Sequence, residues 1–235
     1  VAPVTEKFKV PMVEAEGASR SLFTQGYRYM FAVLSTSEYY LAPVLDIMAD
    51  KAKAMGKNPA DLRISMAFEN DGFSLDVRAG VVDKAKEYGM KIVIDDKLPA
   101  DLSDMSATLT KTKALKPDIL LVSGHSKGAA TAARQIEEMK IDVPLIAYTH
   151  CEAAKVQEKF PKSANGVMCP TQWLSNLPKK DDYFGDAAQW NADFKKAYPE
   201  YNVVPYQTAQ ASAAVLVFKD AFERANSFDR DKVRD

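Results

Sequence analysis

The chain has 235 residues and a formal net charge of −1, from 31 lysines and arginines against 32 aspartates and glutamates. A charge so close to zero gives no electrostatic basis for binding nucleic acid or an acidic membrane surface. The composition is 47% hydrophobic and 27% charged, which is typical of a globular protein that builds its core without disulfide or metal support. No apolar run approaches the ~18 residues that a membrane-spanning helix requires, so we expect no membrane insertion.

The N-terminal part of the chain predicts a short strand near Val10–Val13 and a second extended run at Tyr29–Val33. Between them, a turn at Gly17-Ala18-Ser19 precedes a possible short helix at Arg20–Phe23. The chain opens without methionine and without the charged-then-apolar pattern of a signal peptide. We therefore expect a mature or trimmed chain.

The middle of the chain alternates between two patterns. Its β-rich runs are Leu62–Phe68, Lys91–Ile94, Asp118–Val122, Pro144–Tyr148 and Gly166–Cys169. The stretches between these runs carry apolar residues at helical spacing. Gly89 suits the C-cap of one such helix, and Asp101 or Ser103 suits the N-cap of a helix that enters at Asp104. Strands that alternate with helices predict a doubly wound α/β fold with a parallel sheet covered on both faces.

We interpret residues 34–173 as one such α/β domain. The flanks, residues 1–33 and 174–235, cannot form a complete core alone, although two helices are expected at Asp186–Tyr198 and Tyr206–Ala225. The simplest organisation is a second, discontinuous domain built from both ends of the chain. It requires two crossings between the domains, near Val33–Ser37 and Thr171–Leu174.

One motif, Gly124-His125-Ser126-Lys127-Gly128, matches G-x-S-x-G. It follows a predicted strand and opens an alanine-rich helix, which is the context of the α/β-hydrolase nucleophile elbow. In that interpretation Ser126 is the nucleophile and the amide of Lys127 is part of an oxyanion hole. The fold also needs an acid and then a late histidine, whereas the only histidine after Ser126 is His150. A serine hydrolase therefore remains an alternative, which labelling by a fluorophosphonate probe would support.

The cysteines and histidines limit the metal chemistry. The chain has two cysteines, Cys151 and Cys169, and two histidines, His125 and His150. They form no C-x-x-C motif and no histidine pair at helical spacing, so we expect no metal site and no cofactor. A disulfide and a pair of buried thiols are both open for the cysteines.

The candidate ligand-binding residues follow the strands, because ligands of a doubly wound sheet bind beyond the carboxyl ends of its strands. These residues are Phe73, His125, Thr149, His150 and Trp173. Each has a structural alternative, such as a hydrophobic plug for Phe73 or hinge packing for Trp173. In the other domain, the amides of Gly17-Ala18-Ser19 and the Ser19 hydroxyl could hold an anionic group, or Ser19 could simply cap a helix.

Five segments together resemble the type I periplasmic binding proteins, the solute receptors of ABC importers, in their branched-chain amino acid group: VPMVEAEGAS, GYRYMFAV, ISMAFENDGFSLDV, DLSDMSATLTKTKALKPDILLVSG and QASAAVLVFKDAFERANSFDRDKVRD. The resemblance implies two α/β lobes that close on a ligand at hinge crossings, an extracytoplasmic location, membrane subunits of an importer as partners, and no enzymatic activity. It also implies an incomplete first lobe, because family members carry further segments before and after the matched region.

The same resemblance assigns contacts by position. Gly17-Ala18-Ser19 matches the loop that binds the ligand's carboxylate, and Phe73 and His125 match aromatic positions. The acidic position that receives an α-ammonium falls at Thr149 or His150, and neither residue is acidic. Since an enclosed ammonium without a partner charge is costly, we expect a small organic acid or amide, aromatic ones included, rather than an ordinary branched-chain amino acid. A ligand-sensing regulator or receptor domain with the same lobes is a further alternative.

Overall fold

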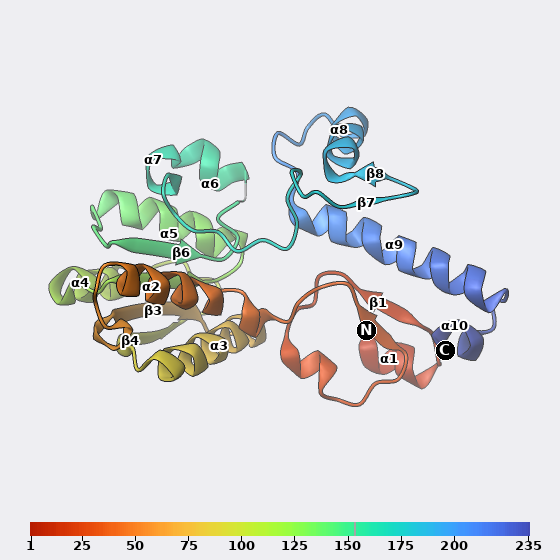
Figure 1. The fold of residues 1–235 in the computed structure, drawn as a ribbon, viewed down its shortest axis with the longest axis horizontal. Coiled ribbons are helices and arrows are strands. Elements are labelled where there is room, and N and C mark those ends of the chain that lie inside the picture. The colour runs from red at the N-terminus through yellow and green to blue at the C-terminus, as the bar shows by residue number, and fades with distance from the viewer. Residues whose placement is uncertain (153) are drawn as a thin grey trace. The chain divides into compact units, whose positions relative to one another are not determined.

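The computed structural model describes residues 1–152 and 154–235. The chain divides into two compact units (Figure 1). Unit 1 contains Val1–Thr36 and Thr171–Asp235, and unit 2 contains Ser37–Pro170. Unit 2 is therefore one continuous segment, whereas unit 1 is assembled from both ends of the chain, and Trp173 belongs to unit 1.

Unit 2 is built on a four-stranded parallel sheet with the strand order β4-β3-β5-β6. The strands are β3 (Arg63–Glu69), β4 (Lys91–Leu98), β5 (Ile119–Ser123) and β6 (Leu145–Tyr148). Each crossover contains a helix, which confirms the predicted α/β class. The predicted fifth strand at Gly166–Cys169 is wrong, because only Met168 pairs with β6, in a single bridge to Ala147. Gly166, with φ of +82°, turns the chain immediately before this short segment.

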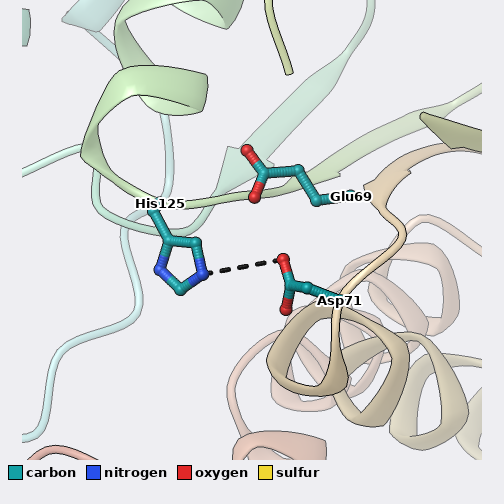
Figure 2. Close-up of side chains that lie close together, drawn as sticks. All are labelled: Glu69, Asp71 and His125. Atoms are coloured by element: carbon teal, nitrogen blue, oxygen red, sulfur yellow. Dashed lines mark ion pairs between the residues drawn. The ribbon is translucent and has the colours of Figure 1, made fainter. Parts of the chain in front are cut away.

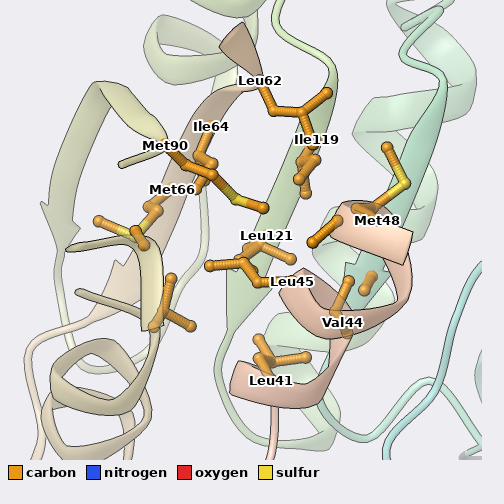
Figure 3. Packing of buried hydrophobic residues seen from close by; sticks show 14 of the residues in the cluster. Leu41, Val44, Leu45, Met48, Leu62, Ile64, Met66, Met90, Ile119 and Leu121 are labelled. Carbon is orange, nitrogen blue, oxygen red and sulfur yellow. The ribbon is translucent and has the colours of Figure 1, made fainter. Parts of the chain in front are cut away.

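Helices cover both faces of this sheet. They are α2 (Ala42–Ala54), α3 (Gly72–Tyr88), α4 (Ser106–Leu115), α5 (Ser126–Glu138), α6 (Ala154–Lys159) and α7 (Pro161–Ala164), with 3-10 turns η2 (Ser37–Tyr39) and η3 (Pro59–Asp61). Ile64 and Met66 of β3 face a cluster with α2 and α3 (Figure 3), while Ala67 faces a second cluster with α4 and α5. This alternation follows from the period of two in a strand and buries the sheet on both sides.

Local signals set the ends of two of these helices. Asp71 caps α3, because its Oδ1 accepts a hydrogen bond from the amide of Ser74 at 2.9 Å. Gly89 ends α3 in the left-handed conformation, with φ of +70°, as predicted. The predicted caps for α4, Asp101 and Ser103, are wrong: its N-cap residue is Met105, which makes no side-chain cap bond. The carboxylate of Asp104 accepts from the amide of Ser106 instead, at 3.0 Å.

Unit 1 has two small sheets. Its elements are α1 (Ala2–Lys7), β1 (Met12–Glu14), η1 (Arg20–Phe23), β2 (Met30–Ala32), β7 (Lys180–Asp181), β8 (Gly185–Asp186), α8 (Ala187–Ala197), α9 (Tyr206–Ala225) and α10 (Arg230–Arg234). Strands β1 and β2 are parallel, and β7 and β8 form an antiparallel pair. Among the helices that the structure describes, none combines the length and the apolar character needed to span a bilayer.

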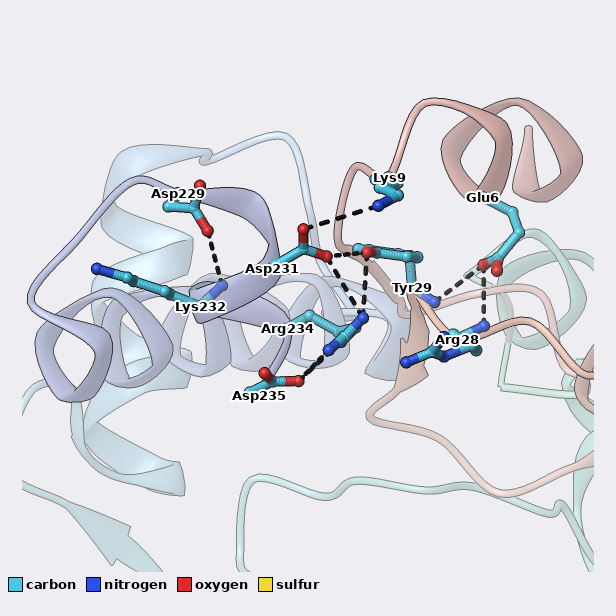
Figure 4. A network of polar contacts seen from close by, with 9 residues as sticks. All are labelled: Glu6, Lys9, Arg28, Tyr29, Asp229, Asp231, Lys232, Arg234 and Asp235. Atoms are coloured by element: carbon cyan, nitrogen blue, oxygen red, sulfur yellow. Dashed lines mark hydrogen bonds and ion pairs between the residues drawn. The ribbon is translucent and has the colours of Figure 1, made fainter.

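A polar network joins the two ends of the chain within unit 1 (Figure 4). The Tyr29 hydroxyl donates to the carboxylate of Asp231 and accepts from Arg234, whose guanidinium also lies over the Tyr29 ring. Lys9 lies 3.8 Å from the same Asp231 carboxylate. On the other side, Glu6 accepts from the amide of Tyr29 at 3.0 Å. These contacts hold α10 against the start of β2 and the segment after α1.

Candidate functional site

Three of the predicted ligand-binding residues meet at the carboxyl edge of the unit 2 sheet. Phe73 follows β3, His125 follows β5 and His150 follows β6. The ring centroid of Phe73 lies 5.5 Å from that of His125 and 5.8 Å from that of His150, and the two imidazoles are 5.8 Å apart. Because parallel strands end at the same edge, loops that are distant in sequence present these rings together. The rings of Tyr40 and Phe73 pack in a T-shaped arrangement with their centroids 5.3 Å apart.

His150 has the less common backbone of the two histidines. Its φ is +58°, a left-handed conformation that few residues other than glycine adopt. Its side chain is only 15% exposed, and Nδ1 lies 3.8 Å from Oε1 of Glu152. His125 is the N-cap residue of α5 and its side chain is 58% exposed. One imidazole is therefore held by its surroundings and the other faces solvent.

Thr149 does not present its side chain at this edge. It is buried, and its hydroxyl donates to the carbonyl of Gly124 at 2.7 Å and accepts from the Gly124 amide at 3.0 Å. Both hydrogen bonds join the loop after β6 to the loop after β5. Thr149 thus positions the two loops that carry the histidines.

A disulfide joins Cys151 to Cys169, with the two Cα atoms 5.6 Å apart. It links the loop that carries His150 to the segment that pairs with β6 at Met168. The sequence left open whether the two cysteines form a disulfide or remain buried thiols, and the structure has the disulfide. It adds a covalent connection directly beside the histidine loop.

Two acidic residues that the sequence analysis did not single out lie beside His125 (Figure 2). Ligand atoms of Glu69, Asp71 and His125 all lie within 4.8 Å of one another, and Oδ2 of Asp71 is 3.6 Å from Nε2 of His125. Glu69 is 1% exposed. Burial, followed by a hydrogen bond to Asp71 and the charge of Asp71, raises the pKa of Glu69 to about 8. By its atom types this cluster could bind a cation, organic or metallic.

The glycines of the G-x-S-x-G motif are explained by Glu69. A Cβ atom on Gly124 or on Gly128 would lie 2.6 Å from Oε1 of Glu69. A side chain at either position would require the Glu69 carboxyl group to move, so the two glycines leave room for that group next to the first turn of α5. The available signal in the sequence was a glutamate at the end of β3 and two glycines after β5, the strand beside it in the sheet.

The geometry does not assemble a hydrolase site at Ser126. Ser126 opens α5, and its backbone lacks the positive φ typical of a strained nucleophile turn. Among the residues that the structure describes, no hydrogen bond connects the Ser126 hydroxyl to either histidine. What the structure shows of the motif is that its two glycines make room for the Glu69 carboxyl group at the strand-to-helix turn.

The candidate anion loop of unit 1 is occupied by its own side chain. Oε1 of Glu14 accepts hydrogen bonds from the amides of Glu16 at 2.8 Å and Gly17 at 2.7 Å. Ala18 is buried, and the Ser19 hydroxyl lies 3.2 Å from that of Ser21. Ser19 precedes η1 in an extended conformation without capping it through its side chain. The Gly17 amide that the sequence assigned to a ligand carboxylate is therefore bound by Glu14.

Trp173 packs within unit 1. Its ring lies 5.1 Å from that of Trp190 on α8, in an edge-to-face arrangement. The two tryptophans line a cavity of about 290 Å³ together with residues of the β7–β8 hairpin and α9. The predicted roles of Trp173, ligand contact or hinge packing, both stay predictions.

Comparisons with known proteins agree with this architecture. The sequence profile of a family described as periplasmic binding protein matches residues 1–235. The leucine-binding protein LivK of Thermotoga maritima superposes with a TM-score of 0.81 at 22% identity, covering 100% of this chain and 63% of LivK. A solute-binding protein of an ABC transporter from Rhodopseudomonas palustris BisB5, in complex with 3,4-dihydroxybenzoic acid, superposes with a TM-score of 0.79 at 16% identity, over 99% and 61% of the two chains.

A curated relative gives the same family. The Leu/Ile/Val-binding protein homolog 8 of Brucella abortus is 22% identical over 136 residues, which are 57% of this chain and 34% of that protein. The chain therefore spans about a third of the length of this relative. With the profile matched over its whole length, the chain belongs to the type I periplasmic binding protein family.

Proposed function

We propose that this chain is the solute-binding component of an ABC importer and acts outside the cytoplasm. In this proposal units 1 and 2 are the two lobes, and they close on a small organic acid, amide or amino acid. Closure stabilised by the ligand then creates the form that the membrane subunits recognise. The disulfide Cys151–Cys169 is in keeping with an oxidising compartment. The proposal includes no enzymatic step.

One observation carries the proposal: the convergence of Phe73, His125 and His150 at the carboxyl edge of the unit 2 sheet. This is the edge at which open α/β sheets bind ligands. The rings offer apolar surface together with imidazole nitrogens that donate or accept hydrogen bonds. Such a surface suits a small molecule with an apolar or aromatic body and a polar group.

The relatives support a small ligand but differ in its chemistry. One structural neighbour is named as a leucine-binding protein, and another contains 3,4-dihydroxybenzoic acid. Neither Thr149 nor His150 supplies the carboxylate that an α-ammonium would need at that position. The proposed ligands therefore include small organic acids and amides as well as amino acids.

The test is a thermal-shift screen of the full chain against amino acids and against aromatic and aliphatic carboxylates and amides. A ligand at ~100 times its dissociation constant adds ~2.7 kcal/mol to the free energy of unfolding, which raises the Tm by several degrees. We expect at least one compound to give this shift, and the Phe73→Ala variant to lose it. The matched control is Phe228→Ala, which truncates a phenylalanine that is 86% exposed in unit 1. Loss of the shift in the control variant, or no shift with any compound, would contradict the proposal.

A further inference from the structure

The cluster of Glu69, Asp71 and His125 is a feature of unit 2 that the proposed function does not use (Figure 2). Its members come from three segments of the chain. Glu69 is the last residue of β3, Asp71 caps α3, and His125 is the N-cap residue of α5. Because one strand end and two helix ends hold these side chains, the cluster is a fixed part of the fold.

The Glu69 carboxyl group lacks a partner inside this cluster. Glu69 is 1% exposed, and its Oε2 atom has no hydrogen-bond partner among the residues that the structure describes. Its Oε1 atom lies against α5, where a Cβ atom on Gly124 or Gly128 would be only 2.6 Å away. Figure 2 shows the carboxyl group directed toward Asp71 and His125. A buried carboxyl oxygen without a partner is costly, and a cation that binds it removes the cost.

The charges around the cluster leave its two acids unbalanced. Among the described residues, neither Glu69 nor Asp71 forms an ion pair with a lysine or arginine, and Asp71 pairs only with His125. The amine of Lys127, in the first turn of α5, lies 3.6 Å from the carboxylate of Asp101 and is engaged there. A neutral imidazole is itself a common metal ligand. A divalent cation would therefore balance both carboxylates and bind the imidazole at one point.

We infer that Glu69, Asp71 and His125 form a binding site for a divalent transition-metal ion, with Zn²⁺ as the ion to test. Carboxylate oxygens and an imidazole nitrogen are zinc ligands, and three protein ligands leave one position open for water. The imidazole favours a transition metal over Ca²⁺ and Mg²⁺, which prefer oxygen ligands and water. The inference goes beyond the proposed function and does not depend on the identity of the solute.

The distances within the cluster suit one metal ion. Zn²⁺ lies ~2.1 Å from its oxygen and nitrogen ligands, so two ligand atoms of one ion stand about 3.0–4.2 Å apart. The 3.6 Å between Oδ2 of Asp71 and Nε2 of His125 falls in this range. All three ligand atoms lie within 4.8 Å of one another. The longest separation therefore has to close by less than about 1 Å, which a small rotation of the exposed His125 side chain can supply.

Hydrogen bonds outside the cluster orient Asp71. Its Oδ1 atom accepts from the amide of Ser74 at 2.9 Å, which leaves Oδ2 for the ion. The Ser74 hydroxyl lies 3.4 Å from Oδ2, and the buried Ser123 hydroxyl donates to Ser74 at 3.1 Å. Partners of this kind fix the orientation of metal ligands.

The sequence analysis expected no metal site because it considered the spacing of cysteines and histidines. This cluster has one histidine, and its two carboxylates stand more than fifty residues before it in the chain. They meet because β3 and β5 are neighbours in the sheet. A strand order that the sequence does not reveal thus creates the cluster.

The test is the binding of Zn²⁺ to the full chain after its metals have been removed with a chelator and the chelator has been removed. Isothermal titration calorimetry at pH 7 should show one Zn²⁺ per chain. X-ray absorption of the zinc-loaded protein should show oxygen and imidazole ligands at ~2.0–2.2 Å and no sulfur ligand at ~2.3 Å. The absence of sulfur separates this site from one formed by reduced Cys151 and Cys169.

Three variants assign the ion to the cluster. Glu69→Gln and Asp71→Asn should each weaken Zn²⁺ binding ~10-fold or more, and His125→Ala should also remove the imidazole signal. Asp71→Asn keeps a side chain that caps α3. Glu138→Gln, on the exposed side of α5, is the matched control and should change the affinity less than twofold. Thermal unfolding of each variant verifies that it is folded.

The possible outcomes separate the inference from the proposed function. If Zn²⁺ does not bind, or binds Glu69→Gln as tightly as the parent, the inference is overturned. Tighter binding of Ca²⁺ or Mg²⁺ than of Zn²⁺, or a sulfur ligand in the absorption spectrum, would overturn it as well. The solute screen, run with a chelator present, tests the proposed function separately, so the failure of either one leaves the other standing.

Discussion

The two units differ in what holds them together. Unit 2 has a four-stranded sheet with a buried apolar cluster on each face. Unit 1 has two-stranded sheets and exposes large apolar side chains, such as Val1 and Phe228. Its ends are joined by the polar network around Tyr29 and Asp231 (Figure 4). Apolar packing therefore dominates unit 2, while polar contacts carry a larger share of unit 1.

This difference also bears on the site. The rings and acids of unit 2 stand on loops that are fixed by buried hydrogen bonds and a disulfide. The matching loop of unit 1 binds its own Glu14 carboxylate. Unit 2 thus offers a preformed surface, which lowers the entropy that a ligand must overcome on binding.

The largest expected effect is in the core of unit 2. Leu121→Ala removes a fully buried side chain from the centre of β5 (Figure 3) and should cost about 2–5 kcal/mol of unfolding free energy. Phe228→Ala in unit 1 should change it by less than about 0.5 kcal/mol, because Phe228 is exposed. Chemical denaturation measures both. Equal losses would break the contrast between the two units.

Glu69→Gln should remove a pH dependence of stability. The pKa of Glu69 is about 8 in the folded protein, against about 4.3 in an unfolded chain. The folded state therefore holds one proton more between these values, and stability falls as pH rises from about 4.5 through 8. At pH 9 we expect the free energy of unfolding of the variant to exceed that of the parent by about 2–4 kcal/mol. Near pH 4 the two free energies should differ little. Thermal unfolding of both proteins from pH 4 to 9 checks this. If stability changes with pH in the same way in parent and variant, the burial assigned to Glu69 is contradicted.

Thr149→Val should loosen the histidine loops. The substitution keeps the shape of the side chain but leaves the amide and carbonyl of Gly124 without the Thr149 hydroxyl. This loss should lower the free energy of unfolding by about 1–3 kcal/mol. Thr149→Ser keeps the hydroxyl and is the matched control. Hydrogen exchange of residues 124–127 should be faster in the valine variant than in the serine variant. Unchanged exchange would show that the loops are held by other contacts.

The smallest effect is expected in the network of unit 1. Tyr29→Phe removes the hydrogen bond to Asp231 and should lower the free energy of unfolding at pH 7 by much less than Leu121→Ala does, because water screens the Asp231 carboxylate. That hydrogen bond lowers the pKa of Asp231, so its contribution is present above about pH 4 and is lost as pH falls below the folded pKa. Urea unfolding at pH 7 and at pH 3 measures the difference, with the exposed Tyr198→Phe as control. A loss as large as that of Leu121→Ala would contradict the expectation that the core of unit 2 contributes more to stability than the polar network of unit 1.

The sequence predicted the elements that depend on local periodicity. The runs that became β3, β5 and β6 were found within a residue or two, because buried strands are nearly continuous in apolar residues. Helix α2 was missed, although Leu41, Val44, Leu45, Met48 and Ala49 follow helical spacing and are buried. Its proline, Pro43, sits in the first turn, where proline is tolerated.

The composition of the site was less accessible from the sequence. The convergence of Phe73, His125 and His150 could be predicted, because each follows a strand and parallel strands end at one edge, while their contact with a ligand stays a prediction. The approach of Glu69 to Gly124 and Gly128 could not, since it depends on how closely α5 packs against the end of β3. The bond between Cys151 and Cys169 likewise depends on the single bridge at Met168, which sequence periodicity does not reveal.

The most direct test of the account is hydrogen–deuterium exchange of the full chain with and without the tightest binder from the thermal-shift screen. The account predicts slower exchange on binding in the three loops after β3, β5 and β6, at residues 70–74, 124–127 and 149–151. Protection confined to other parts of the chain, with these three loops unchanged, would contradict the claim that the carboxyl edge of the unit 2 sheet is the solute site.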